Sequence, residues 1–123
     1  MLIGAHIQFI LVVTGLLSAG ALLLFLAPEA SLARAFGKAP LDEASLALAR
    51  HWGLLVFLIG ALLVYAAFDP PIREPVILVG AIEKAVLGAG VLGTGLSEHP
   101  AVRAAAIGDS LMALIFFLYL AGF

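Results

Sequence analysis

The sequence predicts an all-α integral membrane protein, built as a four-helix bundle with antiparallel, up-down connections. The first observation behind this prediction is composition: of 123 residues, 64% are hydrophobic and 11% are charged. A soluble domain has about 45–50% apolar and about 25% charged residues, and so small a chain has too much surface to bury the excess. The second observation is that the apolar residues form four runs, each near the roughly 20 residues that a spanning helix needs.

The four runs are separated by proline-containing or polar segments. The predicted helices are about 2–26, 45–68, 75–96 and 101–120, within one transmembrane domain that covers 1–123. They lack the alternation of barrel strands, so helices are the spanning structure expected. The connections are about 18, 6 and 4 residues long, and the two short ones require antiparallel neighbours. We expect the first run to be a retained membrane helix rather than a cleaved signal, because it is too long and has no basic residue before it.

The first connection contains a short amphipathic segment, Glu29 to Phe36. Leu32 and Phe36 are four residues apart, so a helix would place both against the headgroup boundary while Arg34 faces water. Gly37 is expected to end this helix. The segment therefore predicts a helical connector at the membrane surface.

Charge excludes several partners and predicts an orientation. The net charge is −2 with no basic patch, so we expect no nucleic acid as partner; the lipid bilayer is the expected one. There is no cysteine and no histidine pair at metal-binding spacing, and we expect no metal and no cofactor. The basic residues favour the side of the first and third connections, which carries Arg34, Lys38, Arg50 and Arg103 against Arg73 alone. The positive-inside rule then places both termini outside the cytoplasm.

Three ionisable residues lie inside the apolar runs: Glu83 and Lys84 in the third, and Asp109 in the fourth. A charge at the centre of a bilayer costs about 2.5–3.5 kcal/mol on insertion scales, so it seldom persists without a partner or a role. At a rise of 1.5 Å per residue, both carboxylates are roughly 12 Å deep from opposite sides, and Gln8 is about 9 Å deep. We therefore expect Gln8, Glu83 and Asp109 to gather near the midplane, with Asp109 pointing inward on a small-residue stripe. Lys84 either points across to Asp109 or extends its side chain towards an interface, and it is the fourth candidate member of this cluster.

This cluster carries the functional hypotheses. We expect it to bind a lipophilic or weakly acidic small molecule, with Arg50 and His51 as further candidate ligand-binding residues at one interface. One alternative is a proton-coupled transporter of hydrophobic compounds, since desolvated carboxylates suit proton exchange. Another is an intramembrane acid–base enzyme such as an isomerase, with Glu83 or Asp109 as base and Lys84 or His51 as acid. The last is a structural subunit in which the cluster only fixes helix register.

Several segments of the chain resemble small bacterial four-helix membrane proteins of the DoxX-like type. The segments are Leu26-Ala27-Pro28-Glu29-Ala30, Arg50-His51-Trp52-Gly53-Leu54-Leu55, Gly60-Ala61-Leu62-Leu63, Arg73-Glu74, Glu83-Lys84 and the late Asp109. The resemblance covers nearly the whole chain and implies a four-helix membrane bundle in the bacterial inner (cell) membrane. Some members resemble accessory subunits of membrane oxidoreductases that pass electrons to quinone. We accordingly expect a homo-oligomer or a subunit of a larger membrane complex.

Overall fold

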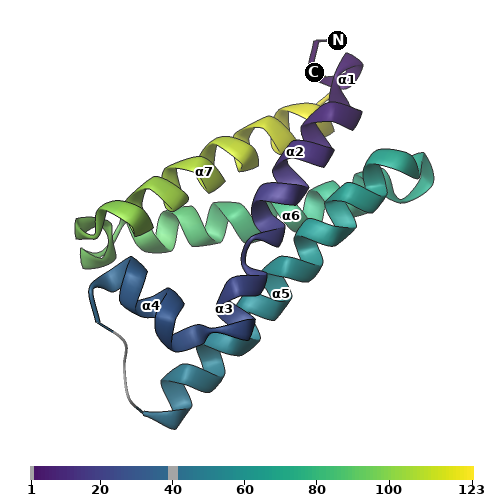
Figure 1. Cartoon of the computed structure of the whole chain (residues 1–123). Helices are drawn as coiled ribbons and strands as arrows, with labels where there is room; N and C mark the ends of the chain where they lie inside the picture. The colour runs from purple at the N-terminus through teal and green to yellow at the C-terminus, as the bar shows by residue number, and fades with distance from the viewer. Residues whose placement is uncertain (1, 39–41) are drawn as a thin grey trace.

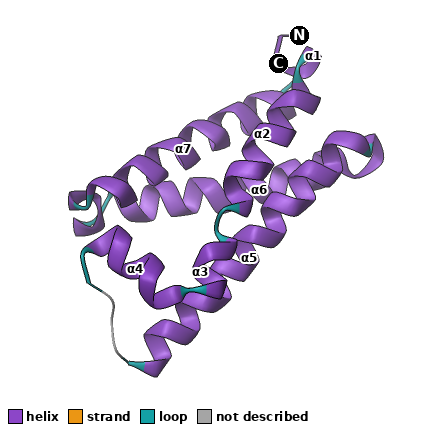
Figure 2. Ribbon diagram, viewed as in Figure 1, coloured by secondary structure: helices purple, strands orange, loops and turns teal. Residues whose placement is uncertain are grey.

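All regular secondary structure in the described residues, 2–38 and 42–123 of a computed structural model, is helical (Figures 1 and 2). Four stretches are long and apolar enough to cross a membrane: Ile7–Leu26, Glu43–Phe68, Pro70–Leu92 and Pro100–Leu120. The predicted all-helical class and the four apolar helices are thus confirmed, with boundaries that differ in three places.

The first stretch is interrupted, although one continuous helix was expected. It consists of α2 (Ile7–Ala19) and α3 (Leu22–Leu26), and a separate short helix, α1 (Leu2–Ala5), precedes it. Between α2 and α3 the backbone tightens: the N–H of Gly20 donates to Leu17 O and that of Ala21 to Ser18 O, each three residues back. Such i→i−3 bonds are those of a 3₁₀ turn, which changes the direction of a helix without leaving its amides unpaired. The apolar pattern contains no signal for this break.

The amphipathic connector forms as predicted. Helix α4 (Pro28–Phe36) starts at a proline, whose missing N–H is harmless in a first turn, and ends at Gly37 with φ of 83°. Arg34 is exposed, as expected from the pattern. The Phe36 ring meets the His99 ring edge-on, with centroids 4.9 Å apart, so α4 is held against the segment that precedes the last helix.

The second and third long helices are joined by a tight turn. Helix α5 (Glu43–Phe68) is capped at its start by Asp42, whose carboxylate accepts from Ser45 N at 2.9 Å. At its end, the Arg73 guanidinium donates to the carbonyls of Ala66 and Ala67 at 3.0 and 2.9 Å. These bonds satisfy carbonyls that a helix end would otherwise leave without donors.

Helix α6 (Pro70–Leu92) begins and ends earlier than predicted. Its start was expected near Pro75, but Pro70 and Pro71 occupy the first turn and Pro75 lies inside the helix. Its end was expected near Leu96, but the chain turns at Gly93 and forms η1 (Gly95–Glu98), a 3₁₀ turn. The turn is stabilised by Thr94, whose hydroxyl donates to Gly90 O and accepts from Leu96 N. Helix α7 (Pro100–Leu120) follows and ends the fold.

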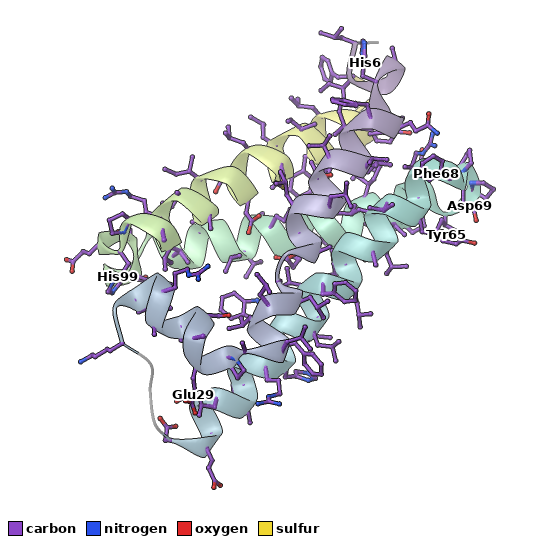
Figure 3. All side chains as sticks on the ribbon, in the orientation of Figure 1. His6, Glu29, Tyr65, Phe68, Asp69 and His99 are labelled. Atoms are coloured by element: carbon purple, nitrogen blue, oxygen red, sulfur yellow. The ribbon has the colours of Figure 1, made fainter. Side chains whose placement is uncertain are left out.

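The long helices pack mainly as two pairs, α2 and α3 with α5, and α6 with α7, and the pairs diverge towards the side that carries α4 (Figure 1). A shared core joins the pairs near the other end; its members are Ile7, Leu11, Leu63, Ala66, Ala67, Ile77, Ala81 and Phe116. The two chain ends meet there, because Phe123 O accepts from the N–H groups of Ile3 and Gly4. Figure 3 places His6, Tyr65 and Asp69 towards this end and Glu29 and His99 towards the opposite one.

Candidate functional site

Lys84 is the centre of the polar cluster. Its side chain is 1% exposed and is the largest fully buried one among the described residues. The ammonium group donates to Ser18 Oγ at 2.5 Å and to Asp109 Oδ1 at 3.3 Å. Lys84 thereby links α6 both to α7, the next long helix, and to α2, whose Ser18 is 66 residues earlier in the chain. Truncating one partner of such a buried pair leaves the other charge without compensation, so the three side chains depend on one another.

Glu83 adds a second carboxylate to the same lysine. Its Oε1 lies 3.9 Å from Lys84 Nζ, a distance for a charge interaction rather than a hydrogen bond. Both carboxylate oxygens of Glu83 are buried, and within residues 2–38 and 42–123 neither has a hydrogen-bond partner. Two acids therefore share one base, and only Asp109 has a direct hydrogen bond from it.

A cavity of about 410 Å³ lies beside Lys84 and Asp109, within the range of about 300–1,000 Å³ usual for small-molecule sites. Its wall is largely apolar and comes from four helices. The lining residues are Leu17, Ser18, Ala21, Val56, Lys84, Ala104, Ala105, Gly108, Asp109 and Met112. The contribution of α7 consists mainly of alanine and glycine, and these small side chains leave the space open.

The break in the first span borders this cavity. Ser18 is in the last turn of α2, and Ala21 lies in the break itself. Irregular backbone at membrane depth occurs where protein or a cavity surrounds it, because lipid offers no hydrogen bonds. The break therefore lies where a spanning helix tolerates one, beside the buried ammonium group.

The structure brings three of the expected residues together and leaves three outside. Glu83 and Asp109 lie near one another as predicted, and Lys84 points to Asp109, the first of its two expected directions. Gln8, expected in the cluster, is exposed near the start of α2, and Ser18 contacts Lys84 instead. Ser18 has a sequence signal, because Gln8, Gly15 and Ser18 share one helix face. The shared face alone does not predict whether Gln8 or Ser18 contacts Lys84.

Arg50 and His51 lie in a different place, on the wall of a second cavity of about 410 Å³. The other lining residues are Phe25, Glu43, Leu46, Ala47 and Leu54, from α3 and the first half of α5. His51 is exposed and lines no part of the Lys84 cavity. An acid–base pair between His51 and Glu83 or Asp109 therefore has no geometric support in this structure.

The cluster can donate a hydrogen bond, accept one and exchange protons. The Lys84 ammonium has three N–H donors, of which two are directed to Ser18 and Asp109. Asp109 lines the cavity and its side chain is 17% exposed, whereas that of Lys84 is 1% exposed, so an entering polar group meets the carboxylate of the ion pair first. The unpartnered oxygens of Glu83 are acceptors for a proton or for a donor group.

Comparison with known proteins adds no assignment, since no protein-family model, curated protein or solved structure matches this chain.

Proposed function

We propose that this chain is a small integral membrane protein whose Lys84–Asp109 cavity binds a lipophilic or weakly acidic small molecule. The observation that carries the proposal is the combination of a fully buried ammonium group with an adjoining cavity of about 410 Å³. A lysine that only fixed helix register would be surrounded by packed side chains. Here the ion pair borders an apolar space, the usual form of a ligand site with a few polar groups that orient the ligand.

The test is equilibrium binding of long-chain carboxylic acids and their matched alcohols to the purified protein in lipid nanodiscs. Lys84→Met keeps the length of the side chain but removes its charge and its donors. We expect it to reduce affinity for the bound probe at least tenfold. Lys38→Met, which changes the other lysine of the chain, is the matched control and should leave affinity unchanged.

A second variant separates binding from folding, because Lys84→Met also leaves Glu83 and Asp109 without their cation. Ala105→Leu fills the cavity from α7 and changes no charged group of the cluster. Loss of binding in both variants supports the proposal. Wild-type affinity in a folded Lys84→Met protein contradicts it, and lower thermal stability with unchanged affinity would instead support the structural-subunit hypothesis.

Glu83 favours a second candidate function, proton-coupled transport of hydrophobic compounds. A buried carboxylate with no hydrogen-bond donor lacks the partners that would hold it in one charge state, so Glu83 is the candidate group for proton exchange. Protonation of Glu83 would change the charge around the adjacent ammonium group, because Lys84 would then interact with one carboxylate instead of two.

Transport is tested by uptake of a lipophilic probe into liposomes under an imposed pH gradient. Glu83→Gln should abolish the gradient-dependent part of the uptake and leave equilibrium binding in place. Glu98→Gln changes an exposed glutamate on η1 and serves as control. Uptake that does not respond to the gradient in wild-type protein would exclude this candidate.

The remaining parts of the proposal follow from charge distribution and resemblance. We place the protein in the bacterial inner membrane as an antiparallel bundle, with both termini outside the cytoplasm and α4 on the cytoplasmic surface. The support is the excess of basic residues on the side of α4 and the meeting of the chain ends at the opposite side. The resemblance to DoxX-like proteins supports assembly with a second copy or with a membrane complex.

A further inference from the structure

A third cavity, of about 380 Å³ and largely apolar, lies under α4 and shares no lining residue with the Lys84 site. Its walls come from α3, α4 and the first turn of α7. The lining residues are Gly20, Leu23, Leu24, Ala27, Ala30, Ser31, Arg34, Ala35 and Ala101. None of these residues lines the Lys84 cavity. The proposed ligand site therefore does not account for this space.

The cavity has one cation and otherwise apolar or neutral walls. Arg34 is exposed, and no carboxylate in the ranges 2–38 and 42–123 lies within salt-bridge distance of it. The hydroxyl of Ser31, one turn before, already donates to Leu23 O at 3.1 Å. Glu29 and Glu98, the acidic residues of α4 and η1, are exposed and do not line the cavity. The guanidinium is thus the charged group available to an occupant.

The position of the cavity along the helices determines what it meets. It lies where the first span ends and α4 begins, which is the headgroup level of a chain that spans the bilayer. This position would let an acyl chain of a neighbouring lipid contact the apolar wall while its head group lies at the level of Arg34. Arginine binds phosphate oxygens in a bidentate manner, and anionic lipids are concentrated on the side that basic residues favour.

We propose that the cavity under α4 binds an anionic phospholipid, with one acyl chain between α3 and Ala101 and the phosphate on Arg34. The bound lipid fills the space that α4 leaves against the two helix pairs and so fixes α4 at the membrane surface. This site is independent of the Lys84 cavity, because the two share no lining residue.

Spin-labelled lipids with identical chains test the proposal in reconstituted wild-type protein. Phosphatidylglycerol should be motionally restricted by the protein more strongly than phosphatidylcholine, and Arg34→Gln should lower that preference about fivefold, the effect of one basic residue near the surface. Arg103→Gln is the matched control, because it removes an equally exposed charge of α7 that does not line the cavity. An equal loss of preference in both variants would mean that the surface potential alone attracts the lipid, and it would contradict a specific site on Arg34.

Two further arms examine the acyl chain. Ala35→Phe fills the cavity without changing charge and should reduce the restricted fraction of phosphatidylglycerol, with folding verified by thermal unfolding. Inorganic phosphate at millimolar concentration should not displace the lipid if the chain contributes to binding. Displacement by phosphate, or unchanged restriction in a folded Ala35→Phe protein, would overturn the acyl-chain part of the proposal.

Discussion

The two helix pairs of this protein approach one another by different means. Between α2 and α5 the contact is backbone on backbone: a Cβ on Gly60 would lie 2.6 Å from both Gly15 O and Ala19 N. Between α6 and α7 the tightest glycine is Gly88, where an added Cβ would meet the hydroxyl of Ser110 first. The atoms that face Gly60 belong to the backbone and cannot move aside, whereas the atom nearest to Gly88 belongs to a side chain that can rotate.

The difference bears on the Lys84 cavity, which lies between the pairs. Close approach through small residues drives helix association in lipid. The backbone contact between Gly15 and Gly60, which we call the glycine seam, therefore fixes α2 against α5. The α7 wall of the cavity is instead lined by Ala104, Ala105 and Gly108, whose small size leaves space rather than contact. Small residues therefore bring helices together at the contact of α2 with α5, and leave a cavity open along α7.

The largest expected effect is at the seam. Gly60→Ala should lower the free energy of unfolding by about 1–3 kcal/mol, the usual cost of forcing an extra methyl into tight packing. Unfolding in detergent followed by circular dichroism measures it. Gly90→Ala, at a helical glycine with no atom within 4 Å of the added Cβ, is the control and should be neutral or stabilising by up to about 1 kcal/mol. Equal destabilisation by both would contradict the rigid seam.

A smaller effect is expected at Gly88. The added methyl of Gly88→Ala should displace the Ser110 hydroxyl from its bond to Ala106 O, which measures 2.8 Å, at a cost of about 0.5–1.5 kcal/mol. In the double variant with Ser110→Ala, the serine is already absent, so the clash should largely disappear. A double-mutant cycle by the same unfolding assay detects this coupling. Additive losses would show that the backbone, and not Ser110, limits the approach of α6 and α7.

The smallest effect is expected outside the membrane, at the cap of α5. Hydrogen bonding to Ser45 lowers the pKa of Asp42 from its ordinary value. A lowered pKa in the folded state means that the stabilisation by this cap is present above the unfolded pKa of about 3.9 and is lost as pH falls through the folded pKa. Hydrogen exchange of the Ser45 amide should therefore lose protection in acid in the wild type relative to Asp42→Asn. Parallel behaviour of the two proteins from pH 6 to pH 3 would contradict the cap.

The sequence predicted the elements of this fold better than their details. Long apolar runs specify spanning helices whatever their neighbours are, and the Leu32, Arg34 and Phe36 pattern specified α4. The sequence predicts a start of α6 near Pro75, because a pair of prolines favours a break, whereas Pro70 and Pro71 in fact fit the first turn of the helix. The turn at Gly20 was missed because it has the same apolar composition as the helix on either side.

The sequence predicted the candidate site only in part, because the site also depends on how the helices pack against one another. Counting residues from the ends of the runs gives depth, and depth correctly predicted that Glu83 and Asp109 lie near one another, where both contact Lys84. It does not give the direction in which a helix face points. Gln8 and Ser18 share a face of the first helix, and only the packing of α2 against α5 and α6 places Ser18 against the lysine and leaves Gln8 exposed.

The sequence by itself determined that this chain forms four long apolar helices with a lysine and two acids within them, because hydrophobicity and chain length are local properties. Tertiary structure alone decided that the lysine is sealed against Ser18 while an open space remains beside Asp109. The physical reason is that burial depends on how closely neighbouring helices approach. That approach is determined by the glycines and alanines that meet across helices, and such pairings are not encoded in any single run.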